Sequence, residues 1–285
     1  MIAAVLVTHN SERWLRATLD SIQNQTRKPD SIIVIDDNST DGTKAILADF
    51  GITPIAATTT ATDVTTRIAQ NFQQGVREAR DSDIVVLGDH DDIWHPTRVE
   101  RQAALLQPMN DESNDQKANS TLLMVASDGT LVDENGTATG GTLRTSFPVA
   151  ANWNDLPANE QLAYALKRSL ATGGSSAIKP GYFAEQEIPE GWLHDRWWSL
   201  LATVRLGMLI DTESVIDYRV QGGQQVGLQT GTQAMSSLGK LRSRMINAGS
   251  TAKKAKDLRT TLRSQCLTPS LWKQLGPLGL LGTGR

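Results

Sequence analysis

The sequence predicts an α/β fold with an open, mostly parallel central sheet and helices on both of its faces. Three observations indicate this. Strand patterns alternate with amphipathic helix patterns through the first hundred residues. The strand patterns are continuous apolar runs, as expected for parallel strands covered on both faces. The chain has 285 residues, enough for one large domain of this kind or for one domain with a small appendage.

The amino-terminal elements follow from the spacing of apolar residues. Four apolar runs predict strands at 2–8, 32–35, 52–57 and 84–87. Helical stripes separate these runs, and Ser11 is placed to cap the first helix. The stripes are formed by Leu15, Leu19 and Ile22, by Ala45 to Leu47, by Ile68, Phe72 and Val76, and by a helix entered at Pro96 that continues through Glu100 and Leu105.

The carboxyl-terminal elements are spaced less regularly. The polar, turn-rich segment 107–120 predicts a surface loop, and the glycine pair at 173–174 ends a helical stripe. The predicted elements are a strand over 122–126, a helix through Leu162, Leu166 and Leu170, a helix over 194–207 and a strand over 214–220.

The distribution of charge divides the chain in two. Residues 1–227 contain 18 Lys and Arg against 30 Asp and Glu, whereas residues 228–285 contain 10 basic residues and one acidic residue. Such a split indicates two segments with different partners. We therefore expect one domain over 1–227, followed by a basic helical segment over 228–285.

Acidic residues follow two of the predicted strands. The second strand runs into Asp36 and Asp37, and the fourth is followed by Asp89, Asp91 and Asp92. Ligands of open α/β sheets bind beyond the carboxyl ends of the strands, so both clusters should face one crevice. Crowded carboxylates repel one another, and a Mg²⁺ or Mn²⁺ ion that also binds phosphate oxygens would relieve the repulsion.

Several classes of protein are excluded by what the sequence lacks. Cys266 is the single cysteine and there are four histidines, which argues against a disulfide framework and a Cys- or His-rich metal centre. The glycine patterns of dinucleotide-binding folds, P-loop NTPases and α/β-hydrolases are missing. No apolar run is long enough for a membrane span, and the apolar amino terminus reads as a strand, so we expect a cytoplasmic protein.

Three segments closely resemble family 2 glycosyltransferases of the GT-A (Rossmann-like) fold. They are residues 5–10, 19–26 and 33–43. The sequence Gly-Asp-His-Asp-Asp-Ile-Trp-His-Pro at 88–96 resembles the Asp-x-Asp-Asp-x-Trp-x-Pro signature of the rhamnosyltransferase-like branch. Further segments that resemble this branch lie at 172–176, 194–198 and 218–219. The resemblance implies a nucleotide-sugar-binding half over 1–106 and an acceptor half over 107–227.

The resemblance also assigns roles to individual residues. Asp195 would be the catalytic base, and Asp91 would be the main metal ligand together with Asp89. The nucleotide sugar would contact Thr8, His9, Asn10, Asp36, Asp37, Arg67, Asn71 and Asp89. The acceptor would contact Trp192, His194 and Trp198, where indole faces suit the C–H surface of a sugar. One position departs from the family, because Gln221 stands where a histidine is common.

The function implied is that of a metal-dependent inverting glycosyltransferase. It would move a sugar, with rhamnose as the candidate, from a dTDP- or UDP-sugar to a glycan or lipid-linked acceptor of cell-surface polysaccharide. Independent chemistry supports the residue types: a divalent ion stabilises the leaving diphosphate, and one carboxylate accepts the proton of the acceptor hydroxyl. Asp195 could instead be an acid that favours the start of a helix.

Two alternative functions stay open at this point. A sugar-nucleotide pyrophosphorylase would need a glycine-rich loop with Lys or Arg near the first strand, which residues 9–13 do not supply. A non-catalytic nucleotide- or glycan-binding relative would agree with Gln221.

The basic carboxyl-terminal segment has two interpretations. Leu238, Leu241 and Met245 share a helical face among basic residues, and further basic residues continue to Arg263. Anionic lipid attracts such segments by ~1 kcal/mol per basic residue, so 238–263 could hold the enzyme peripherally at the inner membrane face. It could equally be a solvated helical pair packed on the domain. We do not expect nucleic-acid binding, because aromatic residues are not interleaved with the basic ones.

Overall fold

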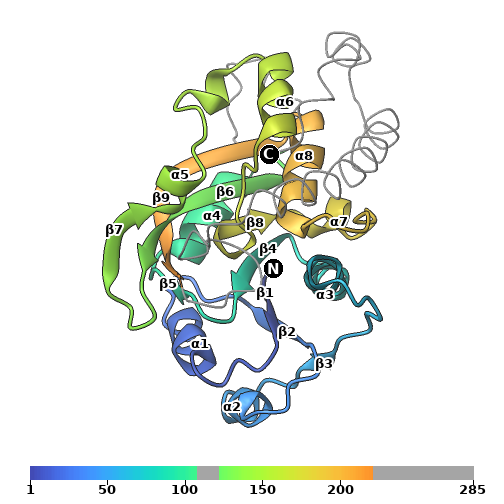
Figure 1. Ribbon diagram of the computed structural model, residues 1–285, viewed down its shortest axis with the longest axis vertical. Helices are drawn as coiled ribbons and strands as arrows, with labels where there is room; N and C mark the ends of the chain where they lie inside the picture. The colour runs from blue at the N-terminus through green and yellow to red at the C-terminus, as the bar shows by residue number, and fades with distance from the viewer. Residues whose placement is uncertain (108–121, 221–285) are drawn as a thin grey trace, which may run out of the picture.

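A single nine-stranded sheet forms the centre of the molecule in the computed structural model, which describes residues 1–107 and 122–220. In Figure 1 the elements of residues 1–78, coloured blue to teal, lie in the lower part of the view, and most elements of residues 122–220, coloured green to orange, lie above them. The sheet continues through both parts. The predicted α/β class, with a mostly parallel sheet, is confirmed. The carboxyl-terminal segment and the 107–120 loop fall almost wholly outside the described residues.

The amino-terminal half of the sheet is parallel, as predicted. Its strands are β1 (Ile2–Thr8), β2 (Ser31–Asp36), β3 (Ile55–Ala56) and β4 (Ile84–Asp89). The order is β3-β2-β1-β4, and in this register Thr8 lies opposite Asp36, and Val7 opposite Asp89. The predicted third strand is reduced from six residues to two. The acidic ends of β2 and β4 therefore flank the end of β1 at the same edge.

Helices cover both faces of these strands. They are α1 (Leu15–Gln23), α2 (Thr43–Asp49), α3 (Val64–Glu78) and α4 (Arg98–Leu106). Alternate residues of β1 enter two different cores: Val5 packs with Phe72 of α3, whereas Leu6 packs with Leu19 of α1. The prediction of Ser11 as a helix cap was wrong, because its hydroxyl accepts a hydrogen bond from the His9 backbone and α1 begins at Leu15.

The second half of the sheet contains antiparallel strands. Its strands are β5 (Ile93–Trp94), β6 (Met124–Val132), β7 (Ala138–Thr142), β8 (Ser176–Ile178) and β9 (Met208–Arg219). Strand β8 lies antiparallel between β4 and β6, and β9 runs parallel to β6. The sequence patterns did not predict β5, β7 or β8, because runs of two to five residues with Gly, Ser or Thr carry little periodic signal.

Helices of the second half add to the cover of both faces, with Leu143 of α5 in the core of Leu6 and most of the others in the core of Phe72. They are α5 (Leu143–Ser146), η1 (Trp153–Asp155), α6 (Ala158–Lys167), η2 (Gly173–Ser175), α7 (Pro180–Phe183) and α8 (His194–Val204), where η marks a 3₁₀ turn. Helices α6 and α8 match their predicted stripes, although Leu170 lies beyond the end of α6. Leu162 of α6 and Leu201 of α8 enter the same core as Phe72, so α8 is held on the face that α3 covers.

The close packing of α3 on β1 gives a first test. A Cβ atom added at Gly75 would lie 2.5 Å from Val5 Cγ1, whereas one at Gly181 would meet nothing within 4 Å. We expect Gly75→Ala to lower the free energy of unfolding by about 1–3 kcal/mol, because the overpacking outweighs the better helix propensity of alanine. Gly181→Ala is the control and should have little effect. Chemical denaturation measures both, and equal stability of the two variants would contradict this packing.

Candidate active site

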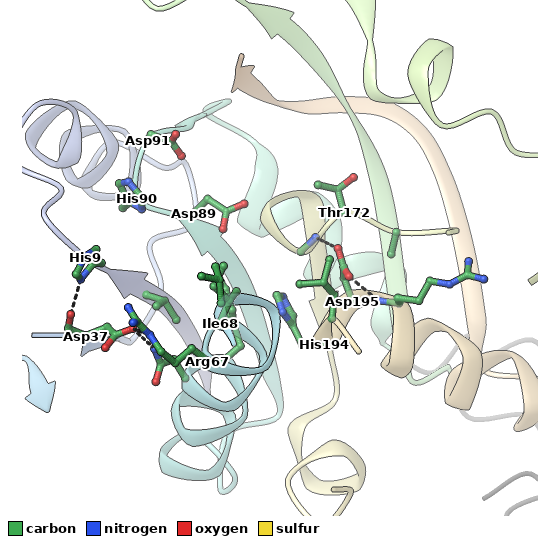
Figure 2. Close-up of a pocket in the computed structure, with 18 of the residues that line it drawn as sticks. His9, Asp37, Arg67, Ile68, Asp89, His90, Asp91, Thr172, His194 and Asp195 are labelled. Atoms are coloured by element: carbon green, nitrogen blue, oxygen red, sulfur yellow. Dashed lines mark hydrogen bonds and ion pairs between the residues drawn. The ribbon is translucent and has the colours of Figure 1, made fainter. Parts of the chain in front are cut away.

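A cavity of about 580 Å³ opens at the carboxyl edge of the parallel strands. Four aspartates from three parts of the chain line it: Asp37, Asp89, Asp91 and Asp195. Figure 2 shows Asp37 with His9 on one side, Asp89 and Asp91 between, and Asp195 on the other side. The structure thus brings together the acidic clusters whose convergence was predicted from strand order.

One side of the cavity is organised around the Asp37 carboxylate. Arg67 Nε and Asn71 Nδ2 each donate to Asp37 Oδ2 at 3.0 Å. The two donors are four residues apart and therefore share one face of α3. His9 Nδ1 donates to the Asp37 backbone carbonyl at 2.5 Å. Asp37, His9, Arg67 and Asn71 all line the cavity, so this side offers several polar groups to one ligand.

Two predicted nucleotide contacts lie behind the Asp37 side of the cavity. Thr8 and Asp36 are buried and do not line the cavity. The Asp36 carboxylate accepts hydrogen bonds from the hydroxyls of Thr8, at 2.9 Å, and Ser39, at 2.6 Å. The prediction that Thr8 and Asp36 contact a ligand is therefore corrected: they hold the loops that carry His9 and Asp37.

Positive backbone φ angles shape the same pair of loops. Asn10 has φ of 49° and Asn38 has φ of 57°, in the left-handed region that asparagine tolerates better than most residues. Asn10 Oδ1 accepts a hydrogen bond from the Thr40 backbone at 2.9 Å, and Ser39 Oγ accepts one from the Asn10 backbone. These cross-loop bonds fix Asn10, a predicted contact, on the cavity wall.

The turn after β4 carries crowded carboxylates. The pKa of Asp89 is raised to about 7 by burial and by the neighbouring charges of Asp91 and Asp195. The pKa of Asp92, which is fully buried, is also raised by burial and by Asp91 and Asp89. The buried guanidinium of Arg98 opposes both shifts. A Cβ atom at Gly174 would come within 2.6 Å of Asp89 Oδ2, so a larger residue there would displace this carboxylate.

This turn suits a small divalent cation. Asp89 and Asp91 present two carboxylates to the cavity. No group of three or more His, Cys, Asp or Glu that could hold a metal occurs within residues 1–107 and 122–220. Mg²⁺ and Mn²⁺ sites of phosphate-binding enzymes need one or two protein carboxylates, because phosphate oxygens and water complete the shell. A cation would also lower the repulsion that raises the pKa of Asp89. Gln221 lies outside the described residues.

Asp195 lies in the first turn of α8 and faces the cavity. Its carboxylate accepts hydrogen bonds from the backbone of Gly173, at 3.0 Å, and of Arg196, at 2.5 Å. Burial raises the pKa of Asp195 to about 6, and those two hydrogen bonds partly offset the rise. The carboxylate is therefore ionised near neutral pH and can accept a proton within the cavity.

The three predicted acceptor contacts occupy different places in the structure. His194 lines the cavity, is stacked on Phe72 at 3.9 Å, and has a pKa lowered to about 3 by burial, so it is neutral. Trp192 and Trp198 do not line the cavity. They are 5% and 0% exposed and belong to the core that α3 and α8 share, so their predicted role in stacking on a sugar is corrected.

Several cavity residues were absent from the predicted site. They are Trp14, Val64, Ile68, Phe147, Ser169, Ala171, Thr172, Leu193, Arg196 and Tyr218 among others. Tyr218 and Thr172 lie in segments that carried the family resemblance, which could have singled them out. Phe147 and Ser169 follow α5 and α6 without a motif, and nothing in their local sequence marks them.

The match to known families agrees with this geometry. Residues 3–115 match the family described as Glycosyl transferase family 2. This segment is similar to family 2 of the glycosyltransferases. It contains β1 through α4, with Asp37, Asp89 and Asp91, and makes up about two fifths of the chain. None of the curated proteins matches the sequence significantly.

Solved structures extend the likeness over both halves of the sheet. Residues 1–349 of S. aureus TarS in complex with UDP superpose with a TM-score of 0.51 at 14% identity, over 77% of this chain and 60% of that one. The glucosyl-3-phosphoglycerate synthase of Mycobacterium tuberculosis, in complex with Mn²⁺, UDP-glucose and phosphoglyceric acid, gives 0.50 at 21% identity, over 79% and 74%. The chain thus spans about three fifths of the TarS chain. The predicted GT-A fold is confirmed.

Repulsion in the acidic turn gives a second test. The pKa of Asp89 in the fold is about 7, above its ordinary 3.8. The fold therefore accommodates the protonated carboxyl at low pH, and this stability is lost as Asp89 ionises when the pH rises through 7. We expect Asp89→Asn to raise the melting temperature of the metal-free protein at about pH 8 by roughly 2–4 °C, and by less at about pH 4. Asp20→Asn, at an exposed site on α1, is the control. A loss of stability at both pH values would contradict the crowding.

Proposed function

We propose that the protein is a nucleotide-sugar-dependent glycosyltransferase. One observation carries the proposal: a single cavity joins the Asp37 side, the Asp89–Asp91 pair and Asp195. These are the three parts that sugar transfer from a nucleotide diphosphate needs, namely a nucleotide site, a cation site at the leaving group and a base.

The nucleotide belongs on the Asp37 side. The Asp37 carboxylate, which Arg67 and Asn71 hold, would accept hydrogen bonds from a pyrimidine ring and its ribose. His9 and Asn10 border the same space. TarS in complex with UDP and the synthase in complex with UDP-glucose share the fold, which supports a UDP- or dTDP-sugar as donor. The resemblance at 88–96 supports rhamnose as the sugar that is moved.

The cation belongs between the nucleotide and the base. Asp91 and Asp89 would hold Mg²⁺ or Mn²⁺, which supplies positive charge to the diphosphate as it departs. Asp92 and Arg98 lie behind this pair and do not face the cavity.

The acceptor belongs at the Asp195 end. Asp195 would take the proton of the acceptor hydroxyl, and one such base is sufficient for a transfer that inverts the anomeric centre. Neutral His194, stacked on Phe72 with both ring nitrogens buried, would shape this end of the cavity by packing. Apolar Phe147 and Leu193 also line the cavity.

The acceptor at the Asp195 end would be a glycan or a lipid-linked acceptor of cell-surface polysaccharide, in agreement with the family resemblance. No helix of residues 1–107 and 122–220 combines the length and apolarity that crossing a membrane requires. We place the activity in the cytoplasm, at the inner membrane face if the acceptor is lipid-linked. Residues 238–263, which would make the peripheral contact, lie outside the described residues.

Binding of nucleotide with metal tests the proposal directly. We expect UDP or dTDP to bind in the presence of Mn²⁺, and Asp91→Asn to weaken this binding by about 100-fold or more, because even the outer-shell partners of metal ligands contribute about 10–100-fold. Isothermal titration calorimetry measures both affinities. Asp83→Asn, at an exposed site outside the cavity, should bind as the wild type does. A wild type that binds neither nucleotide at millimolar concentration would refute the proposed function.

The pH dependence of transfer tests the base. Asp195 must be ionised to accept a proton, and its pKa is about 6, so kcat/KM should fall roughly tenfold per unit below pH 6. Asp195→Asn should lower kcat by about 10²–10⁴-fold. Binding of UDP with Mn²⁺ should persist in this variant, which shows that the fold is intact. Transfer that survives in Asp195→Asn would remove Asp195 from the mechanism.

A further inference from the structure

The helix behind the acidic turn carries two fully buried polar side chains on one face. Arg98 and Gln102 of α4 are both 0% exposed and lie four residues apart. Arg98 Nε donates to Gln102 Oε1 at 3.3 Å, which links the two side chains. Neither lines the cavity, and neither belongs to the predicted site. Buried polar side chains are costly unless their hydrogen bonds serve the fold or the site, so their partners indicate what the pair does.

Arg98 reaches the strand end that leads into the acidic turn. One guanidinium nitrogen donates to the Leu87 backbone carbonyl at 2.5 Å, two residues before Asp89. The guanidinium lies 3.9 Å from the ring centroid of Trp94, which holds it from the other side. Its positive charge favours the ionised forms of Asp92 and Asp89. Arg98 thus supports the cation side of the cavity from beneath.

Gln102 reaches the segment that supports the base. Its amide donates to the Ser175 backbone carbonyl at 2.8 Å and to Ser127 Oγ at 3.0 Å. Ser175 ends the η2 turn, and the same turn supplies the Gly173 backbone donor to Asp195. The next residue, Gly174, donates a backbone hydrogen bond to Asp89. Gln102 therefore holds the η2 turn, which contacts the base and the cation pair at once.

We propose that Arg98 and Gln102 are positioning residues, of which Arg98 fixes the cation-binding turn and Gln102 fixes the η2 turn that holds the catalytic base. The inference rests on the proposed function. Helix α4 is a rigid element, and the two side chains connect it to both parts of the site. Because a misplacement of about 1 Å between reacting groups can lower a rate by about 100-fold, a fixed separation matters for transfer. The two residues should act on different steps, since one supports the cation side and the other the base side.

Two conservative variants separate these effects. Arg98→Lys keeps the positive charge but loses the paired contacts with Leu87 and Trp94, so half-saturation by Mn²⁺ should need about 10–100-fold more metal, with turnover at saturating Mn²⁺ little changed. Gln102→Met keeps the length of the side chain and removes its hydrogen bonds. Turnover should then fall about 10–100-fold, whereas the Mn²⁺ affinity measured with UDP should change less than about twofold.

Gln73→Met is the matched control. Gln73 is a buried glutamine of α3 whose amide donates to the carbonyls of Phe183 and Ala184, away from the acidic turn. It should lose stability as Gln102→Met does, without the change in turnover. Turnover is measured as hydrolysis of the sugar nucleotide that the wild type cleaves fastest among UDP- and dTDP-sugars, and stability as melting temperature.

The outcomes separate the inference from the proposed function. If the wild type is active and Gln102→Met matches Gln73→Met in turnover, the positioning role is overturned and the proposed function stands. The same holds if Arg98→Lys leaves the Mn²⁺ requirement unchanged. If the wild type neither binds UDP with Mn²⁺ nor hydrolyses any of the sugar nucleotides, the proposed function fails and the inference fails with it.

Discussion

Repulsion among the carboxylates that converge at one cavity is the constraint on which the rest of this structure depends. The charges of Asp91, in the same turn, and of Asp195, from a distant part of the chain, both raise the pKa of Asp89. The fold tolerates this crowding because buried Arg98 and the backbone donors of Gly173 and Gly174 partly compensate the negative charge. The same residual repulsion makes the cavity attractive to a divalent cation, so a cost in stability and a capacity to bind metal have one physical source.

The order of the strands explains why the carboxylates meet. Strand β1 lies between β2 and β4, and all three run in the same direction. Their carboxyl ends must then share one edge, which places Asp37 and Asp89 on either side of Thr8. The antiparallel β8 extends this edge, because the η2 turn before β8 holds Asp195 through Gly173. A nucleotide on the Asp37 side would therefore direct its diphosphate toward Asp89 and Asp91, with Asp195 beyond.

The direction in which a side chain points separates residues that look equivalent in sequence. Asp36 and Asp37 are neighbours, yet Asp36 accepts hydrogen bonds from Thr8 and Ser39 inside the loop while Asp37 faces the cavity. Side chains alternate at the end of a strand, so adjacent positions must differ in this way. The tryptophans around α8 show the same effect. Trp198 fills the core between α3 and α8, whereas His194, one turn earlier, reaches the cavity wall.

The local sequence determined the parallel half of the sheet, its helices and the acidic strand ends, because buried strands and amphipathic helices leave periodic patterns within a dozen residues. With the family resemblance it also indicated Asp37, Asp91 and Asp195, and all three line the cavity. Tertiary structure decided what depends on contacts between distant segments. The short strands β5, β7 and β8 form because neighbouring strands pair with them, and the support of the acidic turn by Arg98 and Gln102 requires α4 to meet β4 and the η2 turn. Most of these contacts join residues that are far apart in the sequence, and no local sequence pattern predicts them.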